Sequence, residues 1–124
     1  MEKVNKRALG SRLEEEAARF LTANGVRIVA HNYRTKVGEI DLIGMDGDTL
    51  VFFEVKYRKG DRSGVAAEAV DRRKIAIICR VSDWYRMENH VSADKQIRYD
   101  VIAIDKEDIQ WIRNAFEYSG KCYM

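Results

Sequence analysis

Two acidic side chains and a lysine have the types and spacing of a hydrolytic metal site. Asp41 is followed along the chain by Glu54, and Lys56 lies two residues after Glu54. Their carboxylate oxygens suit a hard ion, Mg²⁺ or Mn²⁺, and the backbone carbonyl of Val55 would be a third ligand. A metal-bound water can act as a nucleophile, and Lys56 would orient it or neutralise charge developing on a phosphate. These residues predict metal-assisted hydrolysis of a phosphodiester bond.

The strand that must carry two of these residues is expected at 49–57. Leu50 and Phe52 point to one face, and the residues between and after them give the other face an apolar character too. A strand that is apolar on both faces is usually central and covered on both sides. Glu54 and Lys56 share the Leu50 face, where burying charges is unfavourable unless they are paired or bind something.

A hairpin would bring Asp41 to the same place. A second strand is expected at 39–45, joined to the first around the turn signal Asp46-Gly47-Asp48. Opposed residues of antiparallel strands point to the same face. A loop with an even number of residues therefore puts Asp41 on the face of Glu54 and Lys56, at roughly 5–8 Å. A three-residue loop without a bulge would put it on the other face.

A purely structural interpretation competes with this one. Glu54 and Lys56 would form a salt bridge, and Asp41 would lie on a solvated edge. For a bare E-x-K motif that alternative is favoured by roughly four to one, because short motifs have high false-positive rates. The acid at matching spacing on the preceding strand reverses the preference.

Hydropathy periodicity supplies the remaining elements and a mixed sheet flanked by helices, in the order α-β-β-β-α-β-β. Besides the two strands above, helices are expected at 6–24 and 66–88, strands at 26–32, 96–105 and 109–116, and loops at 34–38 and 57–64. Asn24-Gly25 is a signal for the end of the first helix.

Composition sets the broad class. With 124 residues, the chain is predicted to form one domain over residues 1–124. Cys79 and Cys122 have neither zinc-ligand nor redox spacing, and two histidines argue against a His-rich metal site. No apolar run approaches the ~18 residues of a membrane span, and residues 1–12 lack a signal-type apolar stretch. The sequence therefore predicts a cytoplasmic protein with no membrane partner.

A net charge of only +2 means that a nucleic-acid partner must be inferred from local clusters. The basic residues expected to contact phosphates are Arg34, Lys36, Arg58, Lys59, Arg62 and Lys74. Such contacts would position a substrate without reading its sequence. A solvated charged face explains each cluster equally well on its own. The aromatic side chains of Trp84, Tyr85, Trp111 and Phe116 are expected in the core or an interface.

Several motifs together resemble a known family. They are GEIDLI at 38–43, FFEVK at 52–56, EAVD at 68–71 followed by Lys74, RYDV at 98–101 and NAF at 114–116. The set is similar to the small bacterial YraN family of the restriction-endonuclease-like (PD-(D/E)xK) superfamily, which is related to archaeal Holliday-junction resolvases. The similarity spans nearly the whole chain. It implies a restriction-endonuclease-like mixed sheet and a divalent-metal phosphodiesterase core.

The resemblance also implies roles. Asp41 matches the metal-binding aspartate, Glu54 the second ligand and Lys56 the catalytic lysine. In the resolvases a helix glutamate completes the site, and Glu14 matches its position. Periodicity alone does not choose between the glutamates at 14 and 16, which lie at opposite rims of the apolar stripe. The family often has glycine where Leu13 stands.

Glu39 also fits the family motif, either supporting the metal ligands or pairing with a nearby arginine. The implied activity is that of a Mg²⁺-dependent endonuclease acting on DNA, with branched or damaged forms among the expected substrates. A homodimer is an expected assembly, because two symmetric cuts need two sites. The alternatives are a nucleic-acid-binding module that has lost catalysis, and a protein-interaction scaffold whose acids form an internal salt-bridge network.

Overall fold

The computed structural model describes residues 6–58, 71–106 and 108–119. The elements, in chain order, are α1 (Lys6–Ala23), β1 (Arg27–Thr35), β2 (Gly38–Asp46), β3 (Thr49–Tyr57), α2 (Arg72–Glu88), β4 (Ile97–Ile104) and β5 (Ile109–Ile112). The five strands form one sheet in sequence order, in which β3 and β4 are parallel and the other neighbours antiparallel. The predicted α/β class and element order are confirmed.

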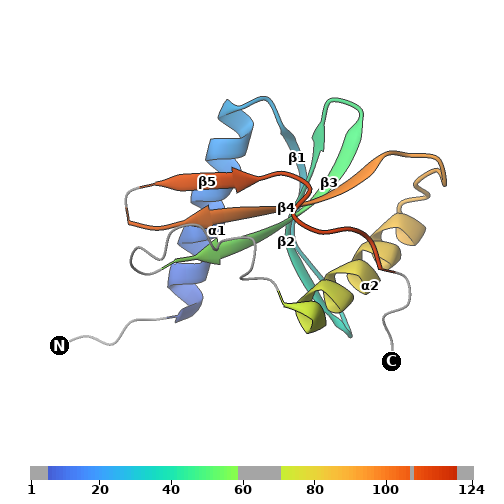
Figure 1. Cartoon of the computed structure of the whole chain (residues 1–124), viewed down its shortest axis with the longest axis horizontal. Coiled ribbons are helices and arrows are strands. Elements are labelled where there is room, and N and C mark those ends of the chain that lie inside the picture. The colour runs from blue at the N-terminus through green and yellow to red at the C-terminus, as the bar shows by residue number, and fades with distance from the viewer. Residues whose placement is uncertain (1–5, 59–70, 107, 120–124) are drawn as a thin grey trace.

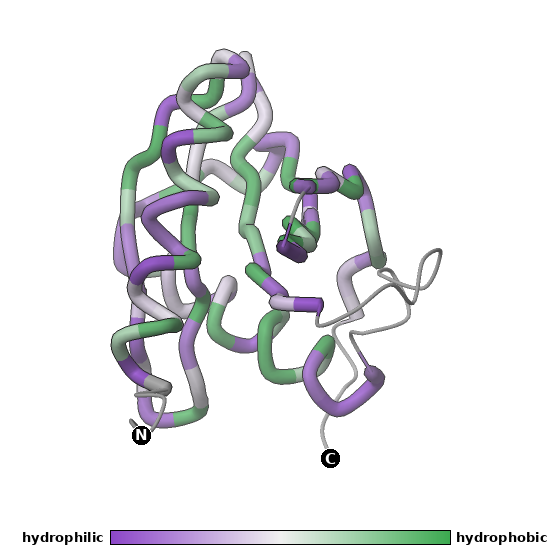
Figure 2. Tube along the Cα trace, turned by 90° about the vertical axis from the view of Figure 1, so that its left-hand side faces the viewer, coloured by the Kyte–Doolittle hydropathy of each residue, from purple (hydrophilic) through white to green (hydrophobic). Residues whose placement is uncertain are grey.

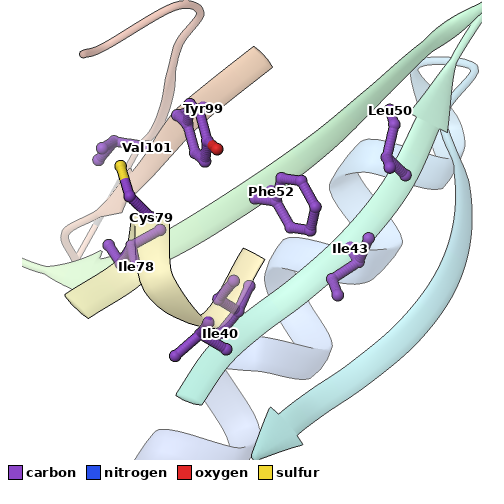
Figure 3. Packing of buried hydrophobic residues seen from close by; sticks show 9 residues of the cluster. Ile40, Ile43, Leu50, Phe52, Ile78, Cys79, Tyr99 and Val101 are labelled. Carbon is purple, nitrogen blue, oxygen red and sulfur yellow. The ribbon is translucent and has the colours of Figure 1, made fainter. Parts of the chain in front are cut away.

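The sheet lies between the two helices (Figure 1). On the α2 face, Phe52 packs with Ile43, Tyr99 and residues of α2, including Cys79 (Figure 3). On the α1 face, Phe53 packs in a second cluster with residues of that helix. Helix α1 alternates hydrophilic and hydrophobic stretches along its length, as an amphipathic helix does (Figure 2). Strand β3 is therefore covered on both sides, as its composition predicted.

A two-residue turn joins β2 to β3. Asp46 pairs with Thr49, and Gly47 between them adopts a positive φ of 64°. Hairpin turns of this length need left-handed backbone, which glycine adopts without a Cβ clash. The loop thus has the even number of residues that the sequence argument required.

Three predicted boundaries are wrong. The basic loop at 34–38 is mostly strand, because β1 continues to Thr35 and β2 starts at Gly38. Helix α2 begins at Arg72 rather than at 66, since Asp71 is extended (φ −84°, ψ 174°) and its carboxylate caps the helix by accepting the Lys74 N–H. Residues 66–70 lie outside the described ranges.

The last predicted strand ends early, at Ile112 rather than at 116. Asn114 adopts a positive φ of 54°, and its backbone N–H donates to Asp100 Oδ1 at 2.8 Å. The chain therefore leaves the sheet, and Phe116 stacks on Tyr99 instead. Among the described residues, no helix is long and apolar enough to cross a membrane.

Candidate active site

Asp41 lies where β2 and β3 stop pairing through their backbones. The ladder runs from Asp46 and Thr49 to Leu42 and Phe53, so the next position would oppose Asp41 and Glu54. There, Asp41 Oδ2 accepts the Val55 N–H at 2.8 Å. The Asp41 carboxylate thus accepts the hydrogen bond that a backbone carbonyl of β2 would accept in a regular ladder.

Regular strand alternation fails beside Asp41. Ile40 and Ile43 both pack in the α2-side cluster, whereas Leu42 packs on the α1 side. The neighbouring strand β1 changes face too, because Asn32 has a positive φ of 49°. The sequence argument assumed unbroken alternation, and that assumption is wrong. The two-residue turn nevertheless puts Asp41 at the position opposite Glu54, next to the last paired residues Leu42 and Phe53.

Helix α1 supplies a third carboxyl. The Glu14 side chain lies within hydrogen-bonding reach of Asp41 and Asn32 and is partly buried. Glu16, its rival on the same helix, is exposed. The structure therefore brings Glu14 to the site, although the family's glycine is replaced by Leu13.

Glu54 is buried, with 5% of its surface exposed. Its ion-pair partner within the described chain is Lys74, whose Nζ lies 3.4 Å from Oε2, rather than Lys56. Lys56 is close enough to lower the pKa of Glu54 by its charge. The salt bridge of the structural alternative therefore exists in a different form, with a lysine from α2.

All three carboxyls hold protons more tightly than free carboxyls do. Burial, followed by repulsion from Asp41, raises the pKa of Glu14 and of Glu54 to about 7. Burial also raises the pKa of Asp41, against the hydrogen bond from Val55. Three acids so close together need protons or a cation at neutral pH. The cluster thus has the electrostatics of a cation site.

The donor set fits a hard ion in chemistry. Asp41 and Glu54 offer carboxylate oxygens, and the Val55 C=O points to the same edge of β3 as its N–H, which already faces Asp41. No group of three His, Cys, Asp or Glu side chains within the described ranges has metal-ligand geometry. Two carboxylates, one carbonyl and waters are the ligand pattern that Mg²⁺ commonly accepts.

Glu39 and the residues predicted to contact phosphates lie outside the buried carboxyl cluster. Glu39 is exposed and forms an ion pair with Arg34 at 2.9 Å. Pairing with an arginine was one of the two roles expected of Glu39. Lys36 is exposed in the β1–β2 turn. Arg58 follows β3, where its N–H donates to Ile104. Lys59 and Arg62 lie outside the described residues.

Two contacts escaped the sequence analysis. Lys74 was expected to contact nucleic acid, but its side chain forms an ion pair with Glu54. The spacing of Lys74 from Asp71 did not reveal that partner. Asn32 faces Glu14 from β1, and a lone asparagine at the end of a predicted strand carries no pairing signal. An asparagine tolerates left-handed backbone better than most residues, and this was the one available indication.

Comparison with known proteins adds family relationships. The model of the uncharacterised protein family UPF0102 matches residues 13–104. A UPF0102 protein of Shewanella loihica is 44% identical over 107 residues, covering 86% of this chain and 92% of that protein. A UPF0102 protein of Lachnoclostridium phytofermentans is 38% identical over 117 residues, covering 94% and 99%. The names of these relatives state no activity.

Proposed function

The chain belongs to the uncharacterised protein family UPF0102, the YraN family that its motifs resemble, and we propose that it is a metal-dependent endonuclease of DNA. One observation carries the proposal: carboxyls from α1, β2 and β3 converge beside Lys56, and burial raises the pKa of all three, with repulsion from Asp41 adding to the shifts of Glu14 and Glu54. Such shifts concentrate at functional sites. A fold gains no stability from gathering buried acids that repel each other.

In this proposal, Asp41, Glu54 and the Val55 carbonyl hold Mg²⁺ or Mn²⁺, and Glu14 completes the acidic cluster from α1. When bound, such an ion supplies Lewis-acid polarisation of a phosphate and a water of lowered pKa. The Lys56 ammonium donates to a phosphate oxygen and stabilises the charge that develops there. The Asp41–Val55 hydrogen bond fixes the direction of the Asp41 carboxylate.

DNA as the substrate, with branched or damaged forms included, is proposed from the resemblance. Exposed Arg34 and Lys36 would contact phosphates beside the site. A cytoplasmic location and a homodimer that makes two symmetric cuts belong to the same proposal.

A second candidate is a binding module that does not cut. The Lys74–Glu54 ion pair favours it, because an internal ammonium neutralises part of the cluster without a metal. An interaction scaffold would use the same pair. Metal binding separates the scaffold from the other two, and cleavage separates the nuclease from the module.

The test is cleavage of labelled single strand, duplex, flap and four-way junction DNA with Mg²⁺, Mn²⁺ or EDTA. Wild type is compared with Asp41→Asn and Lys56→Ala, and with Glu16→Gln as a matched exposed control on α1. We expect metal-dependent cutting by wild type and Glu16→Gln, and a loss of 100-fold or so in the other two variants. Equal cutting by all four preparations, or none in any metal, would exclude catalysis at this site.

A further inference from the structure

Trp84 is an exposed aromatic side chain on α2. Its neighbour Tyr85 packs in the core cluster, and so does Phe116. Trp84 instead is 45% exposed, and Met87, one turn later, is 62% exposed. The expectation of a core or interface position is thus met by Tyr85 and Phe116, whereas Trp84 has a large apolar ring facing solvent.

Two hollows flank the Trp84 ring. One, of about 270 Å³, lies between α2 and the end of β1, with Tyr33, Arg34, Lys36 and Glu88 around Trp84. The other, of about 260 Å³, is lined by residues of α2 alone, among them Arg80 and Met87. An indole that borders both hollows has room for a flat ligand beside it.

The helix that carries Trp84 has a cationic excess, with five arginines and lysines in α2 against two acids, Asp83 and Glu88. Each of these acids lines one hollow and keeps its charge: Glu88 accepts the Tyr33 hydroxyl at 2.6 Å, and Asp83 accepts the Tyr118 hydroxyl at 2.9 Å. Glu39 holds Arg34. Within the described residues, Lys36 and Arg80 form no ion pair. One such cation therefore lies in each hollow.

The exposed side of α2 connects this surface to the carboxylate cluster. The exposed residues 73, 80, 84 and 87 form one stripe at helical spacing, with arginines at 73 and 80, and Ile77 between them is partly buried against the core. Lys74, in the same first turn as the stripe's start, contacts Glu54. At ~1.5 Å per residue, Trp84 lies ~15 Å along the helix from that turn.

The β1–β2 turn runs beside the same stripe. A Cβ built on Gly38 would lie 2.5 Å from Ile77 Cγ2, so the backbone at the start of β2 is packed directly on α2. This contact holds Lys36, two residues earlier, at the Trp84 hollow. The cationic rim and the indole therefore form one surface built from two elements.

We propose that Trp84 is a stacking platform for an unpaired base of single-stranded nucleic acid whose backbone follows α2 from the carboxylate cluster. Binding sites for single strands combine a cationic path with aromatic side chains, and each stacked base adds measurable affinity. A base inside a duplex has no free face to offer. The inference rests on the proposed function and narrows its substrate to DNA with an unpaired stretch beside the cleaved bond.

The experiment measures binding of fluorescently labelled oligothymidylate and a matched blunt duplex in EDTA, which prevents cleavage. Wild type is compared with Trp84→Ala, Trp84→Phe and Val29→Ala, an exposed apolar residue that lines neither hollow. We expect Trp84→Ala to weaken single-strand binding roughly 5- to 100-fold, Trp84→Phe to restore most of it, and Val29→Ala and duplex binding to change little. Bound single strand should also quench intrinsic fluorescence in wild type more than in Trp84→Phe.

Equal affinity of wild type and Trp84→Ala for the single strand would overturn the inference. So would sedimentation showing that Trp84→Ala only dissociates a dimer, with DNA binding intact, because the surface would then bind a second copy. The binding experiment does not depend on cleavage. If Asp41→Asn cuts like wild type, the proposed function fails, and the binding measurements on the Trp84 variants still decide whether Trp84 binds a single strand.

Discussion

At the scale of single residues, the central feature is a cluster of acids that oppose each other in the absence of a cation. Asp41 is anchored by the Val55 N–H, and Glu14 and Glu54 approach it from two other elements. Lys74 offsets part of the repulsion at Glu54. Function and stability therefore act against each other here, as is common at active sites.

This opposition gives the metal-free protein a specific pH dependence. Folding raises the pKa of Glu14 and Glu54 from 4.5 to about 7. The folded protein therefore binds protons more tightly than the unfolded chain, and the stability from these protons is lost as pH rises from about 4.5 to about 7. We expect the unfolding free energy in EDTA to fall by roughly 2 kcal/mol between pH 5 and pH 8. Thermal denaturation across this range measures it, and a flat or rising profile would contradict the shifts.

Removing one of the acids should stabilise the protein. We expect Glu14→Gln to raise the unfolding free energy at pH 8 in EDTA by about 1 kcal/mol, allowing for solvent screening of a partly exposed group. Glu16→Gln, an exposed change on the same helix, should stay within about 0.5 kcal/mol of wild type. Urea denaturation of the three proteins tests this, and a destabilised Glu14→Gln would show that the carboxylate is held by favourable contacts instead.

Spacing and turn parity were enough to predict that Asp41 lies beside Glu54. They could not predict Lys74 on Glu54, because that contact depends on where α2 starts and on how the helix packs across β3. The change of face at Asn32 and Ile40 is equally hidden. Asn32 has left-handed backbone, which periodicity treats as ordinary strand.

At the scale of elements, α2 and the start of β2 are held together by a close backbone contact. Gly38 has a positive φ of 157°, and an added Cβ would meet the Ile77 side chain at 2.5 Å. Since Lys36 and Asp41 lie on either side of this glycine, the contact positions both the cationic rim and the acidic cluster. The start of α2 is set by its cap Asp71, a role that hydropathy did not reveal.

A pair of glycine substitutions tests the contact. We expect Gly38→Ala to lower the unfolding free energy by roughly 1–3 kcal/mol, because the methyl group overpacks a β-branched neighbour. Gly10→Ala in α1, where nothing lies within 4 Å of the added Cβ, should raise it by roughly 0.5–1 kcal/mol through helix propensity. Chemical denaturation of both variants is the measurement. A neutral Gly38→Ala would mean that α2 can move away from β2.

At the scale of the whole molecule, a buried charge network joins the sheet to the chain after β5. Asp100 is fully buried and accepts hydrogen bonds from Arg98, the Trp111 indole and the Asn114 backbone. Arg98 also reaches Asp46 at the end of β2. This network thus links three strands and the C-terminal segment, and Asp100 pairs in the sheet with Phe53, the residue before Glu54.

Asp100→Asn should therefore destabilise the fold. We expect a loss of roughly 3 kcal/mol, because a buried arginine loses part of its counter-charge and an amide NH₂ faces donors. Asp48→Asn, in the exposed β2–β3 turn, is the control and should change little. Urea unfolding decides, and equal stability of the two variants would remove the structural role assigned to Asp100.

The order of elements was predictable because the strands are short, strongly apolar and separated by clear turn residues. The end of β5 was not predictable, because the strand stops just before the Asn114 N–H donates to Asp100 rather than where hydropathy falls. Long-range polar contacts of this kind leave no local pattern in the sequence.

We propose that Asp41 and Glu54, with Glu14 beside them, hold a divalent cation. Calorimetric titration of Mn²⁺ into metal-free wild type, Asp41→Asn and Glu16→Gln at neutral pH tests it most directly. We expect saturable binding by wild type and Glu16→Gln, with proton release because carboxyls with a raised pKa must ionise to bind the ion, and at least tenfold weaker binding by Asp41→Asn. Identical titrations of wild type and Asp41→Asn would contradict it.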